Sequence, residues 1–237
     1  MPLPIEDYAL IGDGRTAALV GRDGSIDWFC CPRFDSPACF AALLGTPGQG
    51  RWQIAPRDAV RRTRRRYRSG TLILETEFET EQGSVRLIDF MPVAASRCEI
   101  LRVIEGLSGR VSMTMELIIR FDYGSMVPWV RRSGGRLIAT TGSNTLELCT
   151  SVDVRGEDMK SVADFELGAG ERVTFALNHH PSYEDAPDVL DAHAALESTE
   201  AGWREWSDRS TYRGRWRESV MRSLLTLKAL IYAPSGG

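Results

Sequence analysis

The chain has 237 residues, of which 43% are apolar and 26% are charged, and its formal net charge is −3. This composition is typical of a globular protein and excludes an intrinsically disordered chain. The small negative charge argues against a general attraction to nucleic acid or to a membrane surface. No apolar run reaches the length of a membrane span, and the first residues lack the basic start and apolar core of a signal peptide.

The cysteine pattern predicts free thiols. The chain has five cysteines, and no pair of them has the C-x-x-C spacing. An odd number with one adjacent pair, Cys30 and Cys31, fits neither a disulfide framework nor a zinc site. We therefore expect buried apolar thiols, and a reducing cytoplasm as the location of the protein.

The segment at residues 25–40, SIDWFCCPRFDSPACF, is the strongest polar and aromatic cluster of the sequence. A sugar has an apolar C–H face and a rim of hydroxyl groups. Trp28 or Phe34 can stack on that face, while Arg33 and Asp35 can form hydrogen bonds with the rim. These four residues are the candidate substrate-binding residues of the chain.

The same segment also fits a purely structural turn. Pro32 and Pro37 can stiffen the backbone, Asp35 can accept hydrogen bonds from nearby amides, and Arg33 can pair with Asp35. From residue types alone we favour this structural interpretation.

An arginine-rich run, RRTRRRYRS, places six arginines between positions 61 and 68. Such a run can bind nucleic acid. It can also form an edge strand whose charges prevent sheet-to-sheet aggregation. The slightly acidic chain and the absence of an RNA-binding motif favour the edge strand.

Alternating apolar residues predict strands from residue 8 to about residue 180. The clearest runs are Val111, Met113, Met115, Leu117, Ile119 and Phe121; Leu72, Leu74 and Phe78, with Glu75, Glu77 and Glu79 on the opposite face; and Val173, Phe175 and Leu177. Turn signals separate the runs at residues 22–24, 82–83, 108–109, 134–135 and 168–170. About a dozen short strands joined in this way predict antiparallel sheets stacked as a sandwich.

After Pro187 the period changes to that of helices. Val189, His193, Leu196, Glu200 and Trp203 define one predicted face. A second and stronger stripe consists of Trp216, Val220, Leu224, Leu227 and Ile231, widened by Met221, Leu225 and Leu230. A helix this apolar normally lies between other helices, so we expect it to be the opening helix of an assembly whose partners are missing.

Catalytic and metal-binding motifs are not evident. Three histidines, His179, His180 and His193, lack further ligands at a spacing that suits zinc. No G-x-S-x-G motif is present, and no pair of carboxylates can be assigned to a common cleft. The sequence therefore predicts no catalytic residue, no metal and no cofactor.

Five stretches occur in a characteristic order: YALIGDGRTAALVGRDGSIDWFCCPRFDSPACFAALLG, LIDFMPV, IIRFDYG followed by PWV, WREW, and YRGRWRESVMRSLLTLKALIYAPSGG. Together they resemble the N-terminal part of bacterial glucoamylase- and trehalase-like proteins of glycoside hydrolase family fifteen. The resemblance spans residues 8–237.

The resemblance implies a supersandwich-like β-sandwich, a helical linker and an (α/α)6 barrel that carries catalysis. In that family two glutamates act as general acid and general base in an inverting hydrolysis. They lie in barrel segments that this chain does not contain, so no catalytic residue is carried over and we expect the chain alone to be inactive. The stretch SVMRSLLTLKALIYAPSGG resembles the first barrel helix.

We accordingly predict three parts: a β-sandwich at 1–185, a helical linker at 186–213, and the start of a truncated barrel at 214–237. The predicted function is that of a non-catalytic N-terminal domain of an inverting α-glycosidase, which supports the barrel and can line a pocket for an α-glucoside. The predicted partners are that barrel, the substrate and a second copy bound through the last helix. The alternatives are a stand-alone carbohydrate-binding sandwich and a regulatory domain whose arginine run docks an acidic partner.

Overall fold

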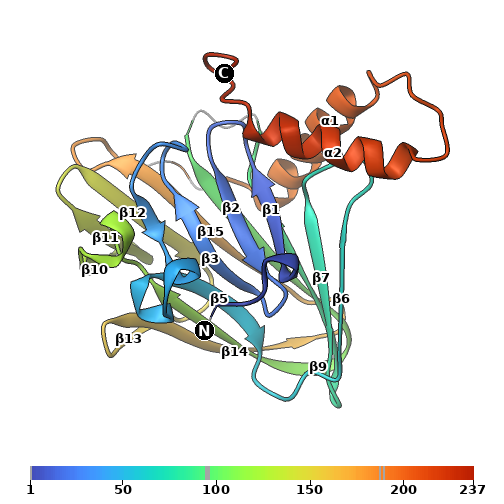
Figure 1. Ribbon diagram of the computed structural model, residues 1–237. Coiled ribbons are helices and arrows are strands. Elements are labelled where there is room, and N and C mark those ends of the chain that lie inside the picture. The colour runs from blue at the N-terminus through green and yellow to red at the C-terminus, as the bar shows by residue number, and fades with distance from the viewer. Residues whose placement is uncertain (1, 94–96, 187, 189) are drawn as a thin grey trace.

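Two antiparallel β-sheets face one another, and two helices lie together at one end of them (Figure 1). The computed structural model describes residues 2–93, 97–186, 188 and 190–237. We call the end that carries the helices the upper edge, as Figure 1 is oriented. The predicted mainly-β sandwich with two C-terminal helices is confirmed.

The described residues form fifteen strands. They are β1 (Tyr8–Gly12), β2 (Ala17–Gly21), β3 (Ser25–Cys30), β4 (Ala38–Phe40), β5 (Arg51–Pro56), β6 (Arg62–Tyr67), β7 (Leu74–Glu79), β8 (Gly83–Phe90), β9 (Glu99–Ile118), β10 (Trp129–Ser133), β11 (Arg136–Thr141), β12 (Asn144–Thr150), β13 (Arg155–Glu157), β14 (Lys160–Gly168) and β15 (Arg172–Pro181). Short 3-10 helices lie at Ile5–Asp7, Ala42–Leu44, Pro47–Gln49 and Asp122–Gly124.

The first sheet has the order β1-β2-β3-β5-β9-β14-β13, with β4 paired to β3. The second sheet has the order β10-β11-β12-β15-β9-β8-β7-β6. Every pairing between these strands is antiparallel. Their inward side chains form one large core, which includes the predicted inward positions Met113, Phe78 and Phe175.

Strand β9 belongs to both sheets. Its first half pairs with β8 and β15, and its second half pairs with β5 and β14. The turn predicted at residues 108–109 is therefore wrong, because the chain does not reverse there. Gly109 has a φ of 63°, and a Cβ atom would lie 2.0 Å from the carbonyl oxygen of Gln82. The Ser-Gly signal thus marks the bend that carries one strand from sheet to sheet.

The arginine-rich run forms β6, which is the edge of the second sheet and pairs only with β7. Arg66 and Arg68 both form ion pairs with Glu75 on β7. Arg61 pairs with Glu81. The edge-strand interpretation is confirmed by the position of β6, and ion pairs with Glu75 and Glu81 engage three of the six arginines.

Helix α1 (Ala192–Ser207) begins at Asp191, whose carboxylate accepts hydrogen bonds from the backbone amides of His193 and Ala194. Ala195 packs on the outer face of the second sheet, and Trp203 packs against α2 (Arg217–Leu230). The predicted face is right for Trp203 and wrong for His193, whose side chain is 64% exposed. Pro187 and Val189 lie outside the described residues.

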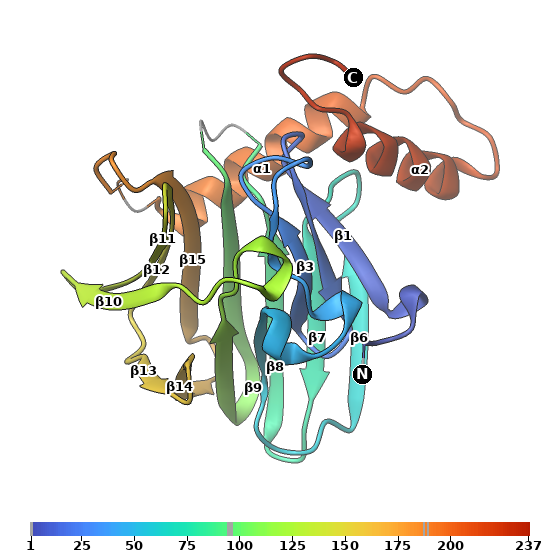
Figure 2. The ribbon, with the colours of Figure 1, turned by 60° about the vertical axis from the view of Figure 1, so that its left-hand side comes forward.

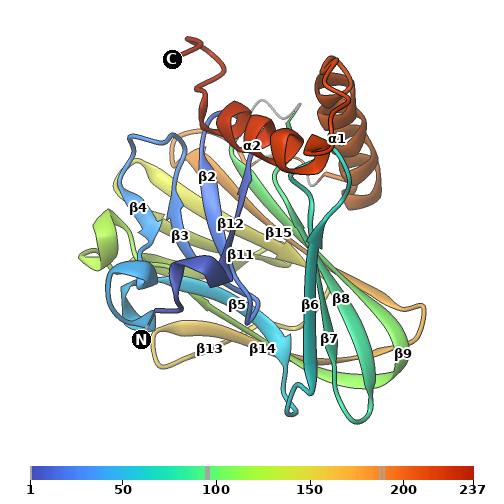
Figure 3. The same ribbon diagram turned by 45° about the vertical axis from the view of Figure 1, so that its right-hand side comes forward.

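Helix α2 lies across the upper edge (Figure 3). Its buried face consists of Met221, Leu225 and Ala229, which pack with Leu72 and Trp203. The predicted stripe is therefore covered only at one margin, where Met221 and Leu225 widen it. Its members Trp216, Leu227, Leu230 and Ile231 are 57%, 60%, 52% and 38% exposed. Both faces of α2 are apolar, and only the contact with the sandwich decides which one is covered.

Neither helix is long and apolar enough to span a membrane within the residues that the structure describes.

Candidate functional site

The loop at residues 31–37 joins β3 to β4 at the upper edge, next to the turn between β1 and β2. The backbone amide of Phe34 donates to the carbonyl oxygen of Arg15 at 3.1 Å. Within the loop, the amide of Ser36 donates to the carbonyl of Arg33 at 3.1 Å. In the neighbouring turn, Asp13 accepts from the amide of Arg15 at 2.7 Å. The loop is thus held by backbone hydrogen bonds, and it exposes Arg33, Asp35 and Pro37 while Cys31 is buried.

Arg33 and Asp35 form a two-pronged ion pair on this loop. The guanidinium Nε and Nη2 atoms donate to the two carboxylate oxygens at 2.9 and 3.0 Å. The side chains are 52% and 71% exposed. The Arg33 guanidinium also lies 4.9 Å from the ring centroid of Tyr232, which follows α2. The pairing that the structural interpretation expects is present, and the exposed edges of both groups can still bind hydroxyl groups.

Trp28 and Phe34, the two predicted aromatic residues, are not part of this ion pair. Trp28 is on β3, where it packs on Cys30, Ala38 and Ala41. Its ring is also tilted against that of Tyr123, with the centroids 6.1 Å apart. Phe34 is half-buried in the loop. Of the four predicted site residues, only Arg33 lines the cavity at the upper edge.

That cavity, which we call the upper-edge pocket, has a volume of about 420 Å³. It lies between the 31–37 loop, the start of β9, the end of β15 and the residues after α2. Its principal polar and aromatic lining residues are Arg15, Arg33, Arg97, His179, His180 and Tyr232. Three arginines and two carboxylates, those of Glu184 and Asp185, line it, so its wall carries a small excess of positive charge.

The two histidines of the pocket are fixed at the end of β15. The Nε2 atom of His179 lies 3.0 Å from the side-chain oxygen of Asn144, and Nδ1 of His180 donates to the carbonyl of Pro181 at 2.9 Å. Burial, together with the neighbouring His180, lowers the pKa of His179 to about 4. At neutral pH this imidazole is therefore an uncharged hydrogen-bonding group.

The side chains that line the upper-edge pocket suit the binding of polar groups. Guanidinium and imidazole groups can hold hydroxyl or anionic groups of a ligand or of a neighbouring protein surface. No group of three or more metal-ligating side chains is found among the described residues. Arg15 and Arg97 were not predicted as site residues, because the sequence does not distinguish them from the many other arginines. His179 and His180 could have been predicted, because two adjacent histidines at the end of a strand are unusual.

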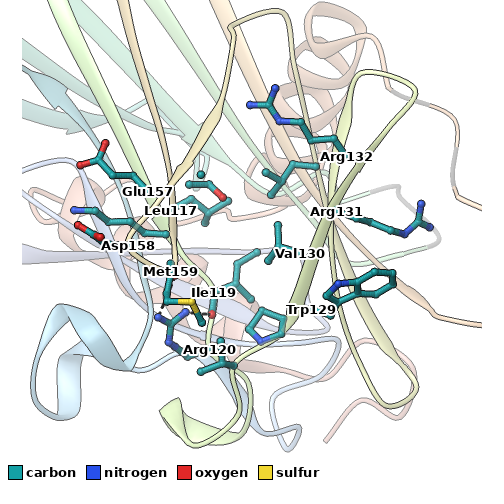
Figure 4. A pocket seen from close by; sticks show the side chains of 16 residues that line it. Leu117, Ile119, Arg120, Trp129, Val130, Arg131, Arg132, Glu157, Asp158 and Met159 are labelled. Carbon is teal, nitrogen blue, oxygen red and sulfur yellow. Dashed lines mark hydrogen bonds between the residues drawn. The ribbon is translucent and has the colours of Figure 1, made fainter.

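A second cavity of about 510 Å³ is lined by residues of β9, β10 and the β13–β14 hairpin. Figure 2 shows β10, β13 and β14 on the same side of the molecule. Leu117, Ile119, Val130 and Met159 line it (Figure 4). Arg120 closes one end, where its guanidinium donates to the carbonyl of Met159 at 3.1 Å. None of the four predicted site residues lines this groove, and its wall is mainly apolar, so we assign the candidate site to the upper-edge pocket.

Comparison with known proteins places the chain in a family. Residues 1–162 match the family described as "Trehalase-like, N-terminal". The chain is 32% identical over 266 residues to the trehalase of Mycolicibacterium smegmatis, which covers 98% of this chain and 39% of that trehalase. It is 30% identical over 243 residues to the trehalase of Thermoplasma volcanium, covering 98% of this chain and 38% of that protein.

A solved structure shares the fold. A bacterial glucoamylase complexed with acarbose matches with a TM-score of 0.67 at 10% identity, over 93% of this chain and 40% of that chain. The chain therefore spans about two fifths of the length of these relatives.

Proposed function

The chain belongs to the family of trehalase-like N-terminal domains, and on that premise we propose that it is a non-catalytic domain of an α-glycosidase that acts on trehalose or a related α-glucoside. In this proposal the sandwich supports a helical catalytic domain. Residues 1–185 form the sandwich, 186–213 the linker, and 214–237 the first part of the catalytic domain.

The exposed face of α2 carries this proposal. The helix buries one apolar face on the sandwich and leaves Trp216, Leu227, Leu230 and Ile231 in solvent. A single helix with two apolar faces needs a second layer, and each large side chain that such a layer covers contributes about 1.5–3 kcal/mol. Further helices packed on this face would form that layer.

The position of α2 adds a second argument. After the helix, the amide of Ala233 donates to the carbonyl of Gly14 at 2.6 Å, and Tyr232 lies against Arg33. The segment after α2 thus contacts the same loops that border the upper-edge pocket. A catalytic domain that continues from α2 would begin beside Arg33 and Asp35, so we propose that these loops line or support its substrate pocket.

A chimera tests the supporting role. We join this chain to the part of the Mycolicibacterium smegmatis trehalase that follows its matching region, and measure trehalose hydrolysis. We expect the chain alone to be inactive and the chimera to be active. Placing carboxylates on the stripe, Leu227→Asp with Leu230→Asp, should lower the activity of the chimera at least about tenfold by removing apolar burial.

The control is Val127→Asp, which puts one carboxylate on another half-exposed apolar residue, away from α2 and beside the second cavity. Light scattering of the chain alone gives an independent readout, because the uncovered stripe should cause self-association that the double variant abolishes. A monomeric chain together with full activity in the double-variant chimera would contradict the proposal.

The pocket-lining role is tested separately in the same chimera. Asp35→Ala should lower turnover by more than its effect on the melting temperature accounts for, because the exposed Arg33–Asp35 pair contributes only about 0–1 kcal/mol to stability. Asp164→Ala removes another surface carboxylate that pairs with arginine, and serves as the control. A lower melting temperature with unchanged turnover would assign Asp35 to the turn alone.

A further inference from the structure

Two cysteines that are far apart in the sequence meet at the upper edge. Cys31 follows β3 and Cys98 precedes β9, and their sulfur atoms lie 3.2 Å apart. Both side chains are buried, with 9% and 2% of their surface exposed, and both are free thiols. A disulfide bond is about 2.05 Å long, so the two sulfurs need to close by only about 1.1 Å to form one.

The other cysteines have different hydrogen-bonding or packing partners, although Cys39 lies close enough to Cys31 and Cys98 for the thiols to interact electrostatically. Cys30 points to the opposite side of β3, where it packs with Ala38. The thiol of Cys39 donates to the carbonyl of Phe29 at 3.4 Å. Cys149 lies on β12, where its thiol approaches the Glu147 carboxylate at 3.5 Å. The geometry therefore selects one pair of the five thiols.

Cys98 is part of the wall of the upper-edge pocket, and Cys31 is not among the residues that line this pocket. Burial raises the pKa of both thiols; that of Cys31 is raised the more strongly, while the hydrogen bond with Cys31 partly offsets the effect for Cys98. A small oxidant in the upper-edge pocket would thus lie beside Cys98. Because its pKa is raised less than that of Cys31, Cys98 has the greater tendency to form the thiolate.

We propose that Cys31 and Cys98 are a reversible oxidation site, which forms a disulfide when a hydroperoxide enters the upper-edge pocket. In the first step the Cys98 sulfur attacks the terminal peroxide oxygen and becomes a sulfenic acid, and with hydrogen peroxide one water leaves. In the second step the Cys31 sulfur displaces the hydroxyl group from Cys98 and a second water leaves. Two thiols together lose two electrons and two protons, which reduce the peroxide.

The disulfide would link the 31–37 loop, which carries Arg33 and Asp35, to Cys98, the residue immediately before β9. It therefore fixes one wall of the upper-edge pocket against another. This oxidation site stands on the geometry of the thiols and does not depend on the proposed function.

The test uses the full 237-residue chain, reduced and then freed of reductant. After treatment with hydrogen peroxide, free thiols are alkylated in denaturant and counted by mass spectrometry. We expect the count to fall from five to three, with a mass loss of about 2 Da, and phosphine reductants to restore all five thiols. Peptide mapping should join the peptide of Cys98 to the one that contains Cys30 and Cys31.

Variants assign the partner within that peptide. Cys30→Ser should retain the cross-link, and Cys31→Ser should lose it and leave Cys98 to oxidise further to the sulfinic acid. Peptide mapping of the unmodified sequence does not depend on how well a variant folds. A cross-link to Cys39, a bond between two chains, or sulfinic acid at Cys98 without any disulfide in the natural sequence would each overturn the proposal.

Discussion

Replacing Asp89 with asparagine is expected to lower the free energy of unfolding by about 3–5 kcal/mol, because it leaves the Arg102 guanidinium buried without its counter-charge. Both side chains are completely buried between the two sheets. Arg102 donates to Asp89 at 2.7 Å from β9 to its neighbour β8. It also crosses the core and donates to the carbonyl oxygens of Trp52 and Gly24 in the first sheet at 2.9 and 2.7 Å.

Urea unfolding followed by tryptophan fluorescence measures this effect. Arg61→Ala is the matched control, because it breaks an ion pair whose side chains are 60% and 73% exposed, and it should change stability by about 1 kcal/mol or less. Adding Arg102→Met to Asp89→Asn should recover part of the loss, since no charge then remains buried. Equal effects of Asp89→Asn and Arg61→Ala would show that the buried pair is not a principal link between the sheets.

The second large effect is expected on α2. Leu225→Ala should destabilise the docked helix by about 2–5 kcal/mol, because Leu225 is fully buried against the cluster around Trp203 and Leu72 and the change leaves a cavity. Leu227→Ala makes the same substitution two residues along, at a position that is 60% exposed. In the dilute chain, where the stripe is not covered by a second copy, it should change stability by about 0.5 kcal/mol or less.

Hydrogen exchange of the amides at residues 217–230 gives the local readout, and thermal unfolding gives the global one. We expect faster exchange in α2 for Leu225→Ala and not for Leu227→Ala. If both variants behave alike, the exposed stripe is also covered in solution, as self-association through α2 would require. Dilution distinguishes these cases, because coverage by a second copy depends on the concentration of the chain.

The large core was predictable because strand alternation is a local property of the chain. The positions of Met113, Phe78 and Phe175 follow from a period of two, since successive side chains of a strand point to opposite faces. The edge position of β6 was equally predictable, because a run of arginines cannot enter a core without partners.

The Ser108-Gly109 pair is a position at which the local sequence does not determine the local structure. A glycine with positive φ can reverse the chain or bend a strand, and the sequence does not distinguish the two outcomes. Pairing with Gly83 and Ser84 on one side, and with β14 just beyond it, decides that β9 continues into the second of its two sheets.

The candidate site was predicted only in part. The 25–40 segment was predicted as one polar loop, whereas residues 25–30 and 38–40 form β3 and β4 and only 31–37 is a loop. The residues that complete the upper-edge pocket, Arg15, Arg97 and His179, come from three other parts of the chain. Likewise, cysteine spacing in the sequence does not predict that Cys31 and Cys98, which are 67 positions apart, are neighbours. Such groups meet only when strands from distant segments end at the same edge.

The sequence by itself determined the fold class, the free cysteines, the edge strand and the family, because each depends on local periodicity, local charge or an ordered set of motifs. The tertiary structure decided which face of α2 is buried, which thiols are neighbours and which arginines share a cavity. The physical reason is the same in each case: a helix with two apolar faces, or a thiol with several possible partners, has no local preference between them, and only the packing of distant strands makes one choice lower in free energy.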